Sequence, residues 1–142
     1  MQLVDANVLI YAVNEDAPAH AVCRRWLDDA LAGNESVGFA WIVLLAFLRV
    51  ATNPAVLADP MSVEEATDQV RTWLAAPAAI VVEPTARHAD LIAGLLSGVG
   101  TAGNLVNDAH LAALASEHRA TVVTFDRDFG RFPGLRTARP SP

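Results

Sequence analysis

Residues 103–129 read GNLVNDAHLAALASEHRATVVTFDRDF, and this stretch decides the fold class. Its alanine-rich part, residues 107–118, predicts a helix with Asp108 at its start. Residues 121–124 are β-branched throughout and predict a short buried strand. Two aspartates follow this strand directly: Asp126 and Asp128. The stretch therefore places one carboxylate near a helix start and two just past the carboxyl end of a strand.

The beginning of the chain repeats this pattern, because residues 2–5 predict an apolar strand that ends at Asp5. If strands 2–5 and 121–124 are parallel neighbours, Asp5 and Asp126 lie at the same edge of the sheet. Ligands of open α/β sheets bind outside the carboxyl ends of the strands. Asp108 would join from a helix N-terminus, where the helix dipole favours negative charge. Converging carboxylates predict a hard divalent cation, Mg²⁺ or Mn²⁺.

The rest of the chain alternates between helical and strand patterns. Helices are predicted over 18–32, 40–51, 62–74 and the segment after Thr85, and buried strands over 36–39 and 79–82. Ser62 with Glu65 three residues later has the spacing of a capping box. The glycine-containing residues 98–103 predict a loop. This alternation predicts a three-layer α/β fold, with a central twisted parallel sheet and helices on both faces.

Composition indicates one folded domain, residues 1–142, with the last few residues as a loose tail. The chain is 53% hydrophobic and only 18% charged, which argues against disorder. No apolar run is long enough to predict a transmembrane helix. The N-terminus lacks the basic region and cleavage site of a signal peptide, so we expect a cytoplasmic protein. A single cysteine, Cys23, allows no internal disulfide and no thiolate zinc site.

The net charge of −6 argues against a binder of duplex nucleic acid, which usually carries a basic surface. A cluster of metal-binding carboxylates would, however, contribute to that negative charge. The acidic balance also suits a protein partner that brings positive charge.

Each aspartate also has a purely structural interpretation, since Asp commonly caps helices and turns. The recurrence of Asp5, Asp108 and Asp126 at predicted element ends favours a shared acidic site. Like charges held close together repel, and a bound cation relieves the repulsion. For Asp128 three roles stay open: a metal ligand, a turn cap, or the partner of a basic residue.

Four further residues are possible supporting groups of the site. Asn7 and Thr124 would orient carboxylates or a metal-bound water by hydrogen bonding, or simply complete a turn and a strand. Asn104 would contact the site or only cap the following helix. Arg49 ends an apolar helix and would bind phosphate or pair with a site carboxylate. The four histidines have no spacing that indicates a metal site.

Two other enzyme or signalling classes are disfavoured. A serine hydrolase would require a nucleophile elbow G-x-S-x-G, and none is present. A phosphoaspartyl receiver domain also places acids at strand ends, but it uses a pair of adjacent early acids and a late lysine. This chain contains no lysine.

Four segments spread over nearly the whole chain resemble the PIN-domain family, and within it the VapC-type toxins of bacterial toxin–antitoxin pairs. They are LVDANVLIYA, FLRVATNP, NLVNDAHLAALA and TFDRDFGRFPGL. The resemblance implies an Mg²⁺- or Mn²⁺-dependent endoribonuclease. It assigns catalytic and metal-binding roles to Asp5, Asp108 and Asp126, with Asp128 as an accessory metal ligand. The family usually carries another acid at the position of Ala46, and here helix 40–51 has none.

The resemblance further implies metal-assisted hydrolysis of RNA phosphodiesters, as in tRNA, rRNA or mRNA. A VapB-like antitoxin would inhibit the chain by placing a basic residue among the acids. Homodimers are typical of such toxins, and the apolar helix 40–51 would supply part of the interface. The missing acid at Ala46 favours an alternative: a catalytically weakened PIN-like module that binds RNA or a protein partner without cleavage.

Overall fold

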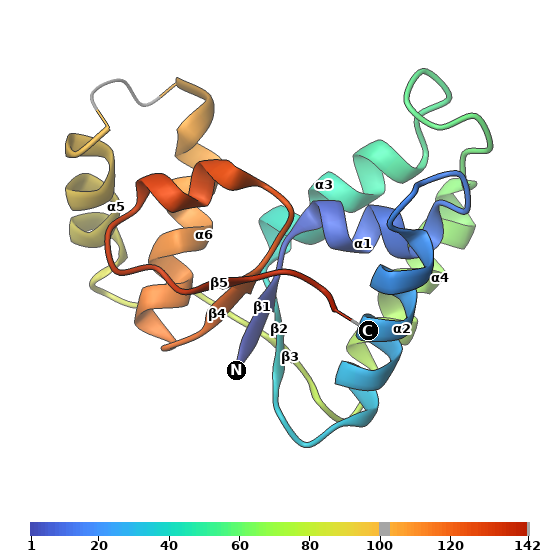
Figure 1. The fold of residues 1–142 in the computed structure, drawn as a ribbon, viewed down its shortest axis with the longest axis horizontal. Helices are drawn as coiled ribbons and strands as arrows, with labels where there is room; N and C mark the ends of the chain where they lie inside the picture. The colour runs from blue at the N-terminus through green and yellow to red at the C-terminus, as the bar shows by residue number, and fades with distance from the viewer. Residues whose placement is uncertain (100–102, 142) are drawn as a thin grey trace.

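The computed structural model describes residues 1–99 and 103–141. In this part of the chain, a parallel sheet has the strand order β3-β2-β1-β4-β5 (Figure 1). The strands, in chain order, are β1 (Gln2–Val4), β2 (Val37–Phe39), β3 (Ala79–Val81), β4 (Thr121–Val123) and β5 (Thr137–Ala138). The predicted α/β fold with a parallel sheet is confirmed.

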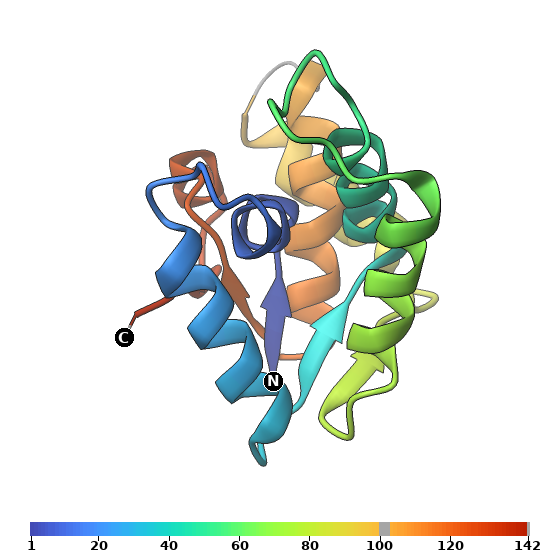
Figure 2. The same ribbon diagram turned by 90° about the vertical axis from the view of Figure 1, so that its right-hand side faces the viewer.

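The helices form two packed groups on either side of the sheet, which Figures 1 and 2 show from two directions. The first group is α1 (Ala6–Val13), α2 (His20–Ala32), α3 (Trp41–Ala51) and α4 (Val63–Leu74), and the second is α5 (His88–Ser97) and α6 (Val106–Glu117). Two short 3-10 turns, η1 (Gly103–Leu105) and η2 (Arg127–Arg131), border α6 and β4. The three-layer arrangement is thus the predicted one.

Helix α1 was not predicted from the sequence. Residues 8–11 are apolar without interruption, so they show neither a helical nor a strand period. The helix begins because Asp5 caps it, with the backbone N–H of Ala6 donating to the Asp5 carboxylate at 2.7 Å. The capping box predicted for α4 is confirmed, since the backbone N–H of Glu65 donates to Ser62 Oγ at 3.0 Å.

The pairing of β1 with β4 sets the position of the acidic residues. Leu3 aligns with Val122, and Val4 aligns with Val123, in parallel register. The backbone N–H of Asp5 then donates to the carbonyl of Val123 at 3.0 Å. The two chain segments therefore leave the sheet at the same edge, as the sequence predicted.

Strand β3 is not buried, contrary to the prediction for residues 79–82. Ile80 and Val81 are 37% and 39% exposed, although Val82 is buried. The strand lies at an edge of the sheet, and a short apolar run does not distinguish an edge position from a central one. Strand β5, at the opposite edge of the sheet, consists of only two residues, both exposed. It therefore has no apolar pattern by which the sequence could predict it.

The core consists mainly of the inner strands and the helices packed on them. Trp73 of α4 contacts Phe47 of α3 and Phe39 of β2, with ring centroids 4.8 Å and 6.4 Å apart. Helix α3 is not buried all round, because Trp41 and Leu45 are 47% and 55% exposed. None of the helices described is both long and apolar enough to cross a membrane.

The segment after η2 packs on the core only in part. Phe132 is buried and Leu135 is half-buried, whereas Pro133 is exposed. Pro140 is buried near the end of the described chain. Of the loop predicted over residues 98–103, residues 100–102 lie outside the described residues.

Candidate metal centre

Asp5 is held in one orientation by the residues at the ends of β1 and β4. One of its carboxylate oxygens accepts from the backbone N–H of Ala6. The other accepts from Asn7 Nδ2 at 2.8 Å and from Thr124 Oγ at 2.7 Å. Burial raises the pKa of Asp5 and the nearby Asp126 charge adds to this effect, while these hydrogen bonds oppose it; the net pKa is raised.

Thr124 and Asn7 join the two strand ends through a hydrogen-bond network. Thr124 is only 3% exposed, and its Oγ also accepts from the backbone N–H of Asp126 at 2.9 Å. Asn7 Oδ1 accepts from the backbone N–H of Phe125 at 3.3 Å. Both side chains thus make the contacts that the predicted orienting role requires.

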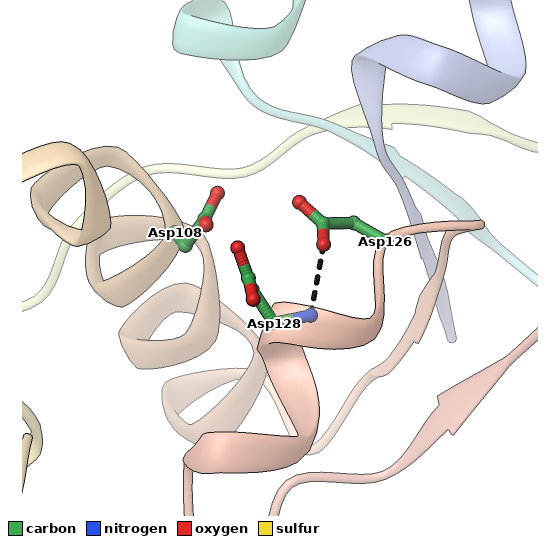
Figure 3. A group of neighbouring side chains, drawn as sticks. All are labelled: Asp108, Asp126 and Asp128. Carbon is green, nitrogen blue, oxygen red and sulfur yellow. Dashed lines mark hydrogen bonds between the residues drawn. The ribbon is translucent and has the colours of Figure 1, made fainter.

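Three other aspartates form a compact cluster, drawn in Figure 3. Asp108 lies in the first turn of α6, Asp126 precedes η2, and Asp128 lies in its first turn. One carboxylate oxygen from each residue lies within 4.8 Å of the other two. The cluster contains three of the four aspartates that the sequence predicted as metal ligands, and Asp5 lies outside it.

Asp128 has contacts that correspond to more than one of its open roles. Its backbone N–H donates to Asp126 Oδ1 at 2.8 Å, which closes the turn. Its carboxylate lies 3.6 Å from Nε of Arg131, and both side chains are well exposed. The same carboxylate belongs to the three-aspartate cluster. An exposed ion pair of this length is weak, so it would not prevent the carboxylate from ligating a cation.

The electrostatics of the site show how strongly these carboxylates interact. Burial raises the pKa of Asp108 to about 6, with further contributions from the charges of Asp126, Asp5 and Asp128. Asp5 therefore belongs to the same electrostatic site although it lies outside the three-residue cluster. Mg²⁺ and Mn²⁺ prefer hard carboxylate oxygens as ligands, and a bound cation would relieve the repulsion between these negative charges. The residues present thus fit a divalent cation.

Comparison with known proteins assigns the family, because the PIN domain model matches residues 3–135. The chain belongs to the PIN-domain family. It is 57% identical over 140 residues to Ribonuclease VapC37 of Mycobacterium tuberculosis, covering 99% of this chain and 97% of the relative. It is 42% identical over 140 residues to Ribonuclease VapC43 of the same species, covering 99% and 95%. The resemblance predicted from the four sequence segments is confirmed.

Solved structures support the PIN fold. The crystal structure of VapBC2 from Rickettsia felis bound to a promoter DNA fragment superposes with a TM-score of 0.72 at 22% identity, covering 99% of this chain and 98% of that one. VapC20 of Mycobacterium tuberculosis, a Sarcin-Ricin loop cleaving toxin, superposes with a TM-score of 0.69 at 16% identity, covering 96% and 99%. At these identities the likeness concerns the fold.

Arg49 and Asn104, which the sequence predicted as supporting residues of the site, stay predictions. Arg49 is exposed in the last turn of α3, and it makes no ion pair among the described residues. Asn104 belongs to η1, but its side chain lies outside the described part of the structure. Ala46, where the family usually has an acid, is half-buried on α3.

The PIN acids do not line a cavity that lies among the helices of the first group. A cavity of about 650 Å³ lies between the end of α1, α2 and α4. Several of its lining residues are acidic, namely Glu15, Asp16, Asp28, Asp59 and Glu65. None of the four site aspartates contributes to it.

Proposed function

We propose that this PIN-domain chain is the toxin of a toxin–antitoxin pair, and that it is a divalent-metal-dependent endoribonuclease. It hydrolyses phosphodiester bonds of RNA, with tRNA, rRNA or mRNA as the substrate class. The observation that carries the proposal is the cluster of Asp108, Asp126 and Asp128 within 4.8 Å, beside Asp5, in a chain 57% identical to a VapC ribonuclease.

Asp108, Asp126 and Asp128 hold the Mg²⁺ or Mn²⁺ ion in this proposal, with Asp5 as the adjacent fourth acid. When bound, the cation supplies charge stabilisation at the scissile phosphate and a lower pKa for the attacking water. Asp5, Asp108 and Asp126 are the catalytic residues. Thr124 and Asn7 fix the orientation of the Asp5 carboxylate.

Asp128 replaces the acid that the family usually carries at position 46. Helix α3 has no acid of any kind, whereas Asp128 lies within ligand distance of the other two aspartates. Arg131 pairs with Asp128 and is expected to release it when a cation is present, because the exposed pair is weak. If Ala46 instead marks a loss of activity, the chain is a PIN-like module that binds RNA or a protein without cleaving.

The proposed partner is a VapB-like antitoxin that places a basic side chain among the aspartates, to which the chain offers a net charge of −6. A second copy of the chain is also proposed as a partner, through Trp41 and Leu45. These two side chains are separated by one helical turn on α3 and are 47% and 55% exposed. We also propose that the toxin acts in the cytoplasm and that residues 1–142 form one domain.

The proposal is tested by metal binding and RNA cleavage measured side by side. Mg²⁺ and Mn²⁺ titrations by calorimetry, and digestion of total RNA, are run on the wild type, Asp108→Asn and the control Asp29→Asn. Asp29 is exposed on α2 and lies outside the acidic site. We expect binding and cleavage in the wild type and the control, and loss of both in Asp108→Asn.

The alternative has a different signature. A wild-type chain that binds no metal at millimolar concentration and leaves total RNA intact contradicts the nuclease proposal. It favours the non-cleaving module, which would still bind RNA or a partner. If Asp108→Asn still binds metal, the cation is held by residues other than Asp108.

A further inference from the structure

A partly buried chain of hydrogen bonds links α5 to α6 and ends at His110, two residues after Asp108. One oxygen of Glu117 accepts from the backbone N–H of Thr85 at 3.0 Å and also from its hydroxyl. The other lies 2.8 Å from Nδ1 of His88, and Nε2 of His88 lies 2.8 Å from Nδ1 of His110. The side chains of Glu117 and His88 are 0% and 12% exposed.

The ionisation state of Glu117 determines which nitrogens of the two histidines carry a hydrogen. Burial raises the pKa of Glu117, but the hydrogen bonds from Thr85 and His88 outweigh that effect and the net pKa is lowered. An ionised carboxylate can only accept, so Nδ1 of His88 carries a hydrogen. The contact between His88 and His110 then requires one donor nitrogen and one acceptor nitrogen, which orders both rings.

This contact is one of the features that hold helix α5 against α6. It contains no fully buried residue, and its N-cap residue Arg87 makes no side-chain capping hydrogen bond. The carboxylate of Glu117 supplies the negative group that a helix N-terminus favours, from the neighbouring helix. In return, groups at the start of α5 satisfy a carboxylate that would be unfavourable at the C-terminal end of α6.

The hydrogen-bonded residues also contact α6 at two points along one side of the helix. His110 and Glu117 are seven residues apart, so they lie on the same side of the helix. Asp108 is two residues before His110, and at about 100° per residue its side chain leaves the helix on roughly the opposite side. The contacts of His110 and Glu117 therefore add to the packing of the buried side of α6 and help to keep Asp108 turned toward Asp126 and Asp128.

We propose that Glu117, His88 and His110 are positioning residues of the metal centre. They act through the rotation of α6 and do not contact the metal or the RNA. The inference rests on the proposed role of Asp108 as a metal ligand. Removal of a group hydrogen-bonded directly to a metal ligand typically weakens metal affinity about 10- to 100-fold, and we expect the lower end of this range for these more distant supports.

The test uses the full chain and two independent measurements. His88→Asn removes the link to His110, and His110→Asn breaks only that last contact and serves as a second variant if the first folds poorly. Mn²⁺ affinity is measured by calorimetry at a temperature where each variant is fully folded. Hydrogen exchange of the α5 amides is measured without metal. His20→Asn is the matched control, because His20 makes one hydrogen bond to the Tyr11 carbonyl in the other helical group.

We expect His88→Asn to weaken Mn²⁺ binding about tenfold and to speed exchange in α5. His20→Asn should change neither quantity. The double variant His88→Asn, His110→Asn should bind Mn²⁺ no more weakly than the worse of its two single variants, because both act through the same hydrogen-bonded chain.

The outcomes separate this inference from the proposed function. Wild-type Mn²⁺ binding with unchanged affinity in folded His88→Asn overturns the positioning role and leaves the metal centre intact. Absence of Mn²⁺ binding in the wild type overturns both. Additive losses of Mn²⁺ affinity in the double variant would show that the two residues act separately. This result would also overturn the inference that they act through one hydrogen-bonded chain.

Discussion

Replacing Asp108 with asparagine is expected to stabilise the metal-free protein at pH 7. In the folded chain, burial and three neighbouring carboxylates raise the pKa of Asp108 from its ordinary value of 3.8 to about 6. At about 1.4 kcal/mol per pH unit, this difference corresponds to at most about 3 kcal/mol. Because Asp108 is only partly buried, solvent screening reduces the expected gain to about 1–2 kcal/mol.

The sign of the pH dependence follows from linkage. Between the unfolded value of 3.8 and the folded value of about 6, the folded state keeps a proton that the unfolded state has released. The contribution of Asp108 to wild-type stability is therefore lost as the pH rises through this window. The advantage of Asp108→Asn should be complete above about pH 6 and absent below about pH 4.

Urea unfolding of the wild type and Asp108→Asn, with chelator and at intervals from about pH 4 to about pH 8, measures this difference. Adding Mg²⁺ should reverse the order, since a ligand at about 100 times its Kd stabilises the wild type by about 2.7 kcal/mol. Asp29→Asn serves as the control. A variant less stable than the wild type at pH 7 without metal, or a gain that does not change with pH, would refute the reasoning.

Three further predictions concern other parts of the chain. Thr124→Val should cost about 1–3 kcal/mol by urea unfolding and weaken metal binding, because Asp5 loses a donor; Thr124→Ser should recover both. Ser62→Ala should cost about 1 kcal/mol by removing a helix cap and leave RNA cleavage at its wild-type rate. Burial raises the pKa of Cys23 to about 11, so a thiol reagent should modify it only after denaturation; rapid labelling of the native chain would contradict its burial.

Elements with a clear local signal could be predicted from the sequence. The capping pair Ser62 and Glu65 marked the start of α4, and the β-branched run before Thr124 marked β4. Helix α1 was missed because its apolar run has no period, and β5 because it has only two exposed residues. The exposure of β3 depends on which strand takes the edge of the sheet, and its local composition does not encode that position.

The chemistry available to this protein can be read from its amino-acid sequence. The sequence provides acids at the ends of two strands and at the start of a helix, and motifs that identify a PIN domain. Which of these acids lie together follows from the fold. It brought Asp128 into the cluster, surrounded Asp5 with hydrogen-bond donors, and joined Glu117 to His88 across two helices. Local patterns depend on neighbours along the chain, whereas these distances and pKa values depend on strand register, helix rotation and burial.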